Sequence, residues 1–104
     1  MFYVKRTNIL SVIKTFADKT TAAVFAGFSA KKLPLEIRKR AREKLDMLHR
    51  ARILDDLRAP PANRSEALSG NREGFWSIRI NNQWRVCFRF ENGDAFDVEI
   101  VDYH

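Results

Sequence analysis

Hydrophobic and polar positions alternate along the last third of the chain, in residues 75–80, 84–90 and 95–101. This period predicts three β-strands, because successive side chains of a strand point to opposite faces. Asn81-Asn82-Gln83 separates the first two runs, and Asn92-Gly93, a dipeptide that accepts the positive φ angles of a tight turn, separates the last two. We therefore predict two consecutive hairpins. The apolar face of the three strands would comprise Trp76, Ile78, Ile80, Trp84, Val86, Phe88, Phe90, Phe96, Val98 and Ile100, and the opposite face Arg79, Arg85, Arg89 and Tyr103.

A helical period precedes these strands. Pro34 suits a first helical position, and a stripe at helical spacing follows it, made of Ile37, Ala41, Leu45, Leu48 and Arg52, with Lys44 and Ala51 at its margin. The stripe predicts the longest helix of the chain, packed on the apolar face of the sheet. Much of the remaining helix surface is basic, and it is either solvated or docks on RNA or an acidic partner. It carries Arg38, Lys39, Arg40 and Arg42.

Shorter elements complete the expected fold. Asp18 is a plausible N-cap for a helix over residues 20–28, and residues 13–16 and 66–68 are expected to form short strands. Residues 59–63, with two consecutive prolines, form a connecting loop, because proline neither continues a helix nor pairs centrally in a sheet. With 104 residues, 45% of them hydrophobic, the chain is expected to form one compact α+β domain.

The chain is basic, and its two cation types are segregated. The net charge is +6 and the sequence pI about 9.9, so the chain either binds a polyanionic partner, nucleic acid before membrane, or is simply a soluble basic domain. Every lysine lies within the first 44 residues, whereas every basic residue after them is arginine. Because the guanidinium group grips phosphate oxygens with two donors, the second half is the better candidate for phosphate recognition.

Few residues could hold a metal or cross a membrane. Cys87 is the only cysteine and His49 and His104 are the only histidines, so no zinc spacing and no internal disulfide is expected, and no cofactor is implied. No apolar run approaches the roughly 18 residues that a membrane span requires. We expect a cytoplasmic protein without a membrane partner.

The chain ends on Asp102, Tyr103 and His104, three polar groups directly after the last predicted strand. Side chains that can exchange protons, held at the end of a strand, are typical of a functional site. An imidazole has an ordinary pKa near 6.5, which suits it to act as a general acid or a general base.

Several segments together resemble the HigB branch of the RelE/ParE toxin superfamily. They are GNREGFWSIRIN, QWRVCF and VEIVDYH, and upstream IKTFADKTT and KLPLEIRKRAREKLDML. The resemblance covers residues 13–104, which are expected to form a single toxin domain. Residues 1–12 lie outside it and are expected to be an N-terminal extension of unknown role.

The resemblance implies a RelE-like microdomain, a small curved antiparallel sheet packed against N-terminal helices. It implies a ribosome-dependent endoribonuclease that cuts mRNA in the decoding site without a metal ion and so inhibits translation. The implied partner is a HigA-like helix-turn-helix antitoxin, and operator DNA would be reached only through that antitoxin.

The resemblance also implies roles for individual residues. Arg85 would bind the phosphate, Tyr103 and His104 would transfer protons or stack on a base, and Asp102 would position the terminal segment. Glu66 is either the general base or an ion-pair partner of a neighbouring arginine, Arg64 or Arg72. The arginines expected to bind RNA are Arg64, Arg72, Arg79 and Arg89.

The chain departs from the family pattern at two positions. Some members carry histidine where this chain has Glu66, and lysine where it has Ser69. Two alternatives therefore stand beside the active endoribonuclease. One is a catalytically weakened homologue that binds its antitoxin and regulates the operon, and the other is a ParE-like inhibitor of DNA gyrase.

Overall fold

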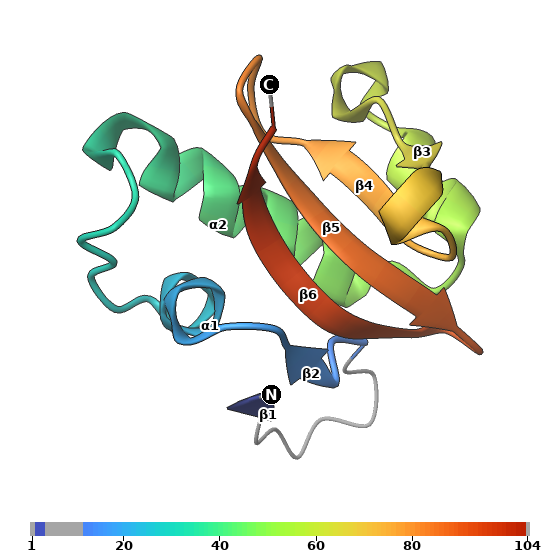
Figure 1. The fold of residues 1–104 in the computed structure, drawn as a ribbon, viewed down its shortest axis with the longest axis horizontal. Coiled ribbons are helices and arrows are strands. Elements are labelled where there is room, and N and C mark those ends of the chain that lie inside the picture. Colours follow the sequence, from blue (N-terminus) through green and yellow to red (C-terminus); the bar gives the residue numbers. More distant parts are fainter. Residues whose placement is uncertain (1, 4–11, 104) are drawn as a thin grey trace.

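The structure, a computed structural model, describes residues 2–3 and 12–103 (Figure 1). The predicted catalytic residue His104 lies outside the described residues, as does most of the expected N-terminal extension. Helices α1 and α2 come first along the chain and the main strands follow them, so the fold is α+β, as predicted.

Helix α1 (Lys19–Ala26) begins where the sequence indicated. The backbone N–H of Thr21 donates to Oδ1 of Asp18 at 2.7 Å, which satisfies one of the free donors at the helix start. Gly27 ends the helix with a φ of 90°, a left-handed conformation that costs glycine little.

Helix α2 (Leu35–Arg50) buries the predicted stripe up to Leu48. Arg52 does not belong to this stripe, because the helix ends at Arg50 and Arg52 is exposed. Lys44, expected at the margin, is buried instead at 7% exposure. Short 3-10 helices follow, η1 (Leu54–Arg58), η2 (Pro61–Asn63) and η3 (Gly70–Arg72).

The described strands form one sheet in the order β1-β2-β6-β5-β4-β3. Neighbouring strands are antiparallel except β2 and β6, which are parallel through Phe16 and Val98. Helix α2 covers one face of the sheet, and the other face is turned to the viewer in Figure 1. The strands are β1 (Phe2–Tyr3), β2 (Thr15–Phe16), β3 (Glu66–Ala67), β4 (Trp76–Arg79), β5 (Trp84–Glu91) and β6 (Asp94–Asp102).

The core lies between α2 and the sheet. Ile78, Val86 and Val98 from three strands are fully buried together with Leu45 and Leu48 of α2. Burial of each such side chain contributes roughly 1.5–3 kcal/mol, so this contact is the main driving force for the fold. It also fixes which face of β4, β5 and β6 points away from the helix.

One expected core residue, Phe96, was assigned to the wrong face. Strand β6 contains an irregularity at Asp97, which has a φ of 53°, and the register opposite it shifts between Cys87 and Arg89. An inserted residue of this kind interrupts the alternation of faces. Phe96 therefore lies beneath the guanidinium of Arg89, whose carbon is 5.6 Å from the centroid of the Phe96 ring. Ala95 takes the buried position instead.

The segment before β2 is attached to the sheet. Val12 is buried, and its carbonyl accepts a hydrogen bond from the N–H of Ala95 at 2.7 Å. Strand β1 pairs with β2, Phe2 opposite Phe16. Residue 12 thus packs with the domain, and the role of residues 1–12 as a separate extension stays a prediction.

Candidate active site

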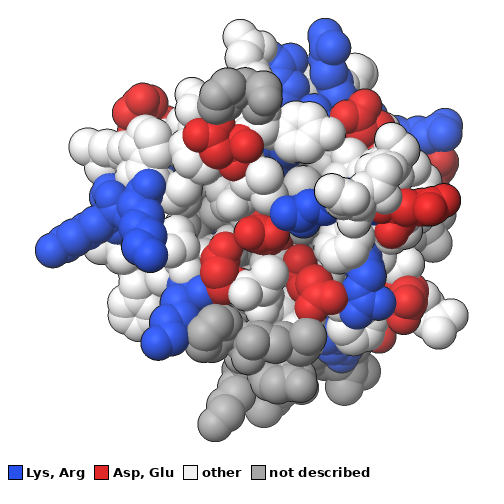
Figure 2. Space-filling model, viewed as in Figure 1, with Lys and Arg blue, Asp and Glu red and all other residues white. Residues whose placement is uncertain are grey.

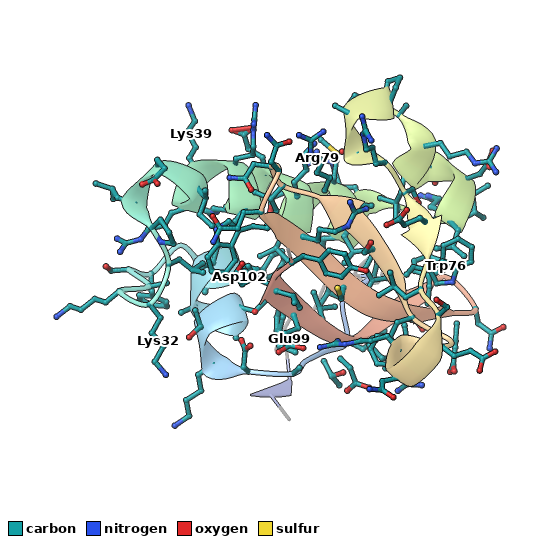
Figure 3. All side chains as sticks on the ribbon, turned by 45° about the horizontal axis from the view of Figure 1, so that its top comes forward. Lys32, Lys39, Trp76, Arg79, Glu99 and Asp102 are labelled. Atoms are coloured by element: carbon teal, nitrogen blue, oxygen red, sulfur yellow. The ribbon has the colours of Figure 1, made fainter. Side chains whose placement is uncertain are left out.

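A pocket of about 220 Å³ opens where β4 ends, β5 begins and β6 ends. We call it the Arg85 pocket. Its lining contains three arginines and no acidic residue, and it includes four of the residues predicted from the sequence. The lining residues are Arg64, Arg79, Asn81, Asn82, Arg85 and Tyr103. Figure 3 shows Arg79 at this end of the sheet and Asp102 at the end of β6.

Two arginines lie side by side in the lining of the pocket. Arg79 on β4 and Arg85 on β5 are directly opposite partners in the antiparallel register. Like charges in such a pair repel and destabilise a sheet unless something between them compensates. Two opposed guanidinium groups lining one hollow are therefore suited to bind an anion such as a phosphate.

The Arg85 side chain is buried and held in place. Its Nε donates to the Ser77 hydroxyl at 2.7 Å, and its Nη2 donates to the Arg64 carbonyl at 2.6 Å. No hydrogen bond from Nη1 to another described residue is formed, so this nitrogen keeps its donors for a ligand. The guanidinium is thus oriented before any substrate arrives.

Tyr103 covers Arg85. The guanidinium carbon lies 5.8 Å from the centroid of the Tyr103 ring, within range of a cation–π contact, and the Tyr103 side chain remains 44% exposed. Gln83 forms two hydrogen bonds with this terminal segment. Its carbonyl accepts from the N–H of Tyr103 at 2.5 Å, and its Nε2 donates to Oδ1 of Asp102 at 3.1 Å. Asp102 thereby links the terminal segment to the hairpin.

Glu66, the candidate base, contacts the buried arginine. Oε1 of Glu66 lies 3.6 Å from Nη2 of Arg85, and the Glu66 side chain is 52% exposed. Its ion pair within the described part of the chain is with Arg85, and not with Arg64 or Arg72 as the sequence suggested. The carboxylate therefore stands beside the guanidinium expected to hold the phosphate.

Arg72 and Arg89 lie outside the pocket. Arg72 forms an ion pair with Glu99 at 3.1 Å, and Arg89 forms one with Asp97 at 2.9 Å. Figure 2 shows the same mixture over the open face of the sheet, where acidic and basic side chains alternate. The predicted roles of these two arginines in RNA binding stay predictions, and the structure does not bring them to Arg85.

Two buried polar residues, to which the sequence analysis gave no role at the site, hold the loop that carries Arg64. Nδ2 of Asn63 donates to the Leu57 carbonyl at 3.1 Å, and Nζ of Lys44 donates to Oδ1 of Asn63 at 2.5 Å. The next residue, Arg64, takes a left-handed conformation, and its carbonyl is the acceptor for Arg85. Asn63 therefore fixes the loop that orients Arg85. A lone asparagine after two prolines carries no sequence signal for such a role.

Burial lowers the pKa of Lys44 below its ordinary value, and the neighbouring charge of Arg40 lowers it further. Both causes act against the charged form, since desolvation and a like charge each raise its free energy. An anion bound close to Lys44 would instead raise this pKa.

The asparagines of the hairpin shape the pocket's rim. Oδ1 of Asn81 accepts from the N–H groups of Gln83 and Trp84, each at 2.8 Å, which fixes the turn. Oδ1 of Asn82 accepts from Nη2 of Arg79 and so positions that arginine. From the sequence these asparagines were interpreted only as turn residues. The sequence signal for their place at the pocket was their position between two strands that carry arginine.

The described residues offer neither a metal site nor a membrane-spanning helix. Within residues 2–3 and 12–103, no three His, Cys, Asp or Glu side chains lie close enough together to hold a metal ion. No helix in that part of the chain is long and apolar enough to cross a membrane.

Sequence comparison identifies relatives. The family described as the RelE-like toxin of the type II toxin-antitoxin system HigB matches residues 14–104. The "Endoribonuclease HigB" of Proteus vulgaris is 31% identical over 89% of this chain and 100% of its own length. "Toxin HigB-1" of Vibrio cholerae is 42% identical over 62% of this chain and 68% of its own.

Solved structures agree on the fold. The YoeB dimer of Staphylococcus aureus superposes with a TM-score of 0.57 at 19% identity, over 90% of this chain and 97% of YoeB. The YoeB-YefM complex of the same organism gives 0.56 at 17% identity, over 88% and 97% of the two chains. These structural similarities support the fold, and the sequence match over residues 14–104 identifies the family. The chain belongs to the HigB-like toxins of type II toxin-antitoxin systems.

Proposed function

We propose that the protein is an endoribonuclease that cuts mRNA on the ribosome and so stops translation, with the Arg85 pocket as its active site. The observation that carries the proposal is the pair Arg79 and Arg85, opposed on adjacent strands in a pocket whose lining contains no acidic residue. The curated relative of Proteus vulgaris that matches along its whole length is named an endoribonuclease, which supports the same activity.

The pocket suits the negative charge that RNA cleavage creates. When the 2′-oxygen attacks the neighbouring phosphorus, a pentavalent phosphorane forms and its equatorial oxygens gain charge. Donors already aimed at that charge stabilise the transition state, and each is worth roughly 2.7–4 kcal/mol. Arg85, buried and held by Ser77 and the Arg64 carbonyl, would act without reorganising.

The reaction needs a base, an acid and a leaving group. The base removes the 2′-OH proton as the bond from the 2′-oxygen to phosphorus forms, and the bond from phosphorus to the 5′-oxygen breaks while the acid protonates that oxygen. The products are a 2′,3′-cyclic phosphate and a 5′-OH. No atom changes its oxidation state and no further reactant is consumed.

We assign the base to Glu66 and the acid to His104. The Glu66 carboxylate lies 3.6 Å from Arg85 and is half exposed, so it can reach a ribose whose phosphate binds that arginine. His104 follows Tyr103 directly in the chain and carries an imidazole, the side chain most often used as a general acid. Tyr103 offers its exposed ring as a stacking surface for a base.

Members of toxin-antitoxin families act with an antitoxin, and the partner class of this chain is therefore an antitoxin. We propose that it is a HigA-like helix-turn-helix protein, that operator DNA is contacted through it, and that the ribosomal decoding site presents the mRNA. The basic net charge of +6 supports association with RNA.

Ribosome dependence is tested by giving the purified protein the same mRNA free and on translating ribosomes. We expect cleavage on ribosomes and little cleavage of the free RNA, because the decoding site is proposed to present the mRNA to the Arg85 pocket. Primer extension maps the cuts. Efficient cleavage of free RNA at low protein concentration contradicts ribosome dependence, whereas no cleavage in either sample favours the catalytically weakened homologue.

A further inference from the structure

A second basic hollow continues from the Arg85 pocket. It has a volume of about 280 Å³ and shares Arg79, Asn81 and Asn82 with the first, so the hairpin after β4 forms the boundary between them. We call it the Arg40 pocket. Its lining residues are Arg40, Lys44, Ala62, Arg79, Ile80, Asn81 and Asn82.

The charged side chains that line the Arg40 pocket are all basic. Arg40, Lys44 and Arg79 line it, and none of its lining residues is acidic. The hollow between α1 and α2 is different, because Glu43 and Asp46 line it together with its basic residues. A lining without acids concentrates positive potential in the hollow and therefore favours an anionic ligand.

Its cations are positioned by the fold. Arg40 and Lys44 stand one turn apart on α2, and like charges at this spacing repel. Lys44 is buried, and of its three N–H donors one is used by Asn63 within the described structure. Arg40 is exposed and forms no ion pair with another described residue. These donors are available to a phosphate, which would also offset the repulsion.

We propose that the Arg40 pocket is a second phosphate subsite, which binds a phosphodiester of the substrate strand next to the one in the Arg85 pocket. This inference rests on the proposed function, since it takes RNA as the ligand. Arg79 and Asn82 would contact the strand between the two phosphates, and the two pockets would hold the strand in a single direction across the end of the sheet. Such a clamp keeps the scissile ribose in register with Arg85.

The test measures binding of RNA that cannot be cut. Fully 2′-O-methylated oligonucleotides of two and of five nucleotides are titrated with the complete protein at several salt concentrations, by fluorescence anisotropy. The five-nucleotide strand reaches both pockets, so we expect it to bind more tightly and with a steeper dependence on salt. Each phosphate contact on a single strand contributes about 0.7 to the slope of log K against log salt.

Arg40→Gln is compared with Arg50→Gln, which removes the same charge from an exposed arginine of α2 that lines neither pocket. We expect Arg40→Gln to lower the slope for the long strand by about 0.7 and to leave the short strand unchanged, while Arg50→Gln changes neither. Equal losses in the two variants, or a wild-type protein that binds both lengths alike, would overturn the subsite.

A second arm separates the substrate strand from ribosomal RNA as the source of the phosphate. Both variants are sedimented with vacant ribosomes that carry no mRNA, and we expect Arg40→Gln and Arg50→Gln to associate equally. Selective loss of vacant-ribosome binding by Arg40→Gln, with long-strand affinity intact, would overturn the proposal. Because these strands cannot be cleaved, the result does not depend on whether the protein cuts mRNA.

Discussion

Arg85 combines a structural contact with the chemistry proposed for it. Its guanidinium is buried and donates to the Ser77 hydroxyl and to the Arg64 carbonyl, and it also meets the exposed carboxylate of Glu66. From the sequence, Arg85 was expected to bind the phosphate. The structure adds a cost in stability, because the buried Ser77 hydroxyl and the partly buried Arg64 carbonyl lose their donor when the side chain is removed.

We predict that Arg85→Ala lowers the rate of mRNA cleavage on ribosomes by about 10²- to 10³-fold, the loss typical of one transition-state donor. The same change should lower the free energy of unfolding by about 1–3 kcal/mol, since the buried Ser77 hydroxyl and the Arg64 carbonyl become unpaired. Rates are measured by single-turnover cleavage and stability by urea unfolding. Arg58→Ala, at an exposed arginine paired with Asp55, is the control and should change neither. A normal cleavage rate for Arg85→Ala would remove Arg85 from the active site.

Tyr103 was left with two possible roles, proton transfer or stacking. The contact of its ring with the Arg85 guanidinium and its 44% exposure favour a stacking surface. We predict that Tyr103→Phe keeps the cleavage rate within about threefold, whereas Tyr103→Ala loses about 10-fold or more, as expected when a stacking contact of 1–3 kcal/mol is removed. If Tyr103→Phe is as slow as Tyr103→Ala, the hydroxyl and not the ring carries the function.

At the scale of elements, the alternation of residues predicted β4, β5 and β6 closely, because burial of one sheet face against α2 dictates that pattern. The same pattern failed at Phe96. The positive φ of Asp97 is a local feature of the backbone, and an aspartate within a predicted strand gives no sequence signal for it. Strand β2 also pairs parallel with β6, a long-range contact that no local period contains.

The loop between η1 and β3 shows a second limit of the sequence. Residues 59–63 were interpreted as a connector, yet Asn63 is fully buried and bonds to Lys44 and to the Leu57 carbonyl. A buried amide is recognised only when its acceptors and donors are known in space. In this loop they come from α2 and η1.

We predict that Asn63→Ala lowers the free energy of unfolding by about 1–3 kcal/mol, because Lys44 would stay buried without its acceptor. The variant should also cleave more slowly, since the Arg64 carbonyl that orients Arg85 would move. Urea unfolding and the cleavage assay measure the two effects. Asn71→Ala, at an exposed position, should shift stability by no more than about 0.5 kcal/mol. Equal stability of the two variants would show that Asn63 does not support the loop.

At the scale of the whole molecule, the site is assembled from four segments of the chain. The hairpin register alone brings Arg79 opposite Arg85, and the last strand carries Tyr103 to the same end, so these three could be predicted from the sequence. Arg64 arrives through the loop that Asn63 fixes. The Arg40 pocket was not predictable, because it needs the docking angle of α2 against the hairpin.

We propose that this HigB-like toxin cleaves RNA by attack of the 2′-hydroxyl within the Arg85 pocket. The most direct measurement uses ribosomes programmed with an mRNA that carries one 2′-deoxynucleotide at a mapped cleavage position. We predict that cleavage disappears at that position alone, and that the unmodified mRNA yields a 2′,3′-cyclic phosphate and a 5′-OH at the cut, as read by mass spectrometry. Cleavage that persists at the 2′-deoxynucleotide, or products that carry a 5′-phosphate, would contradict the account.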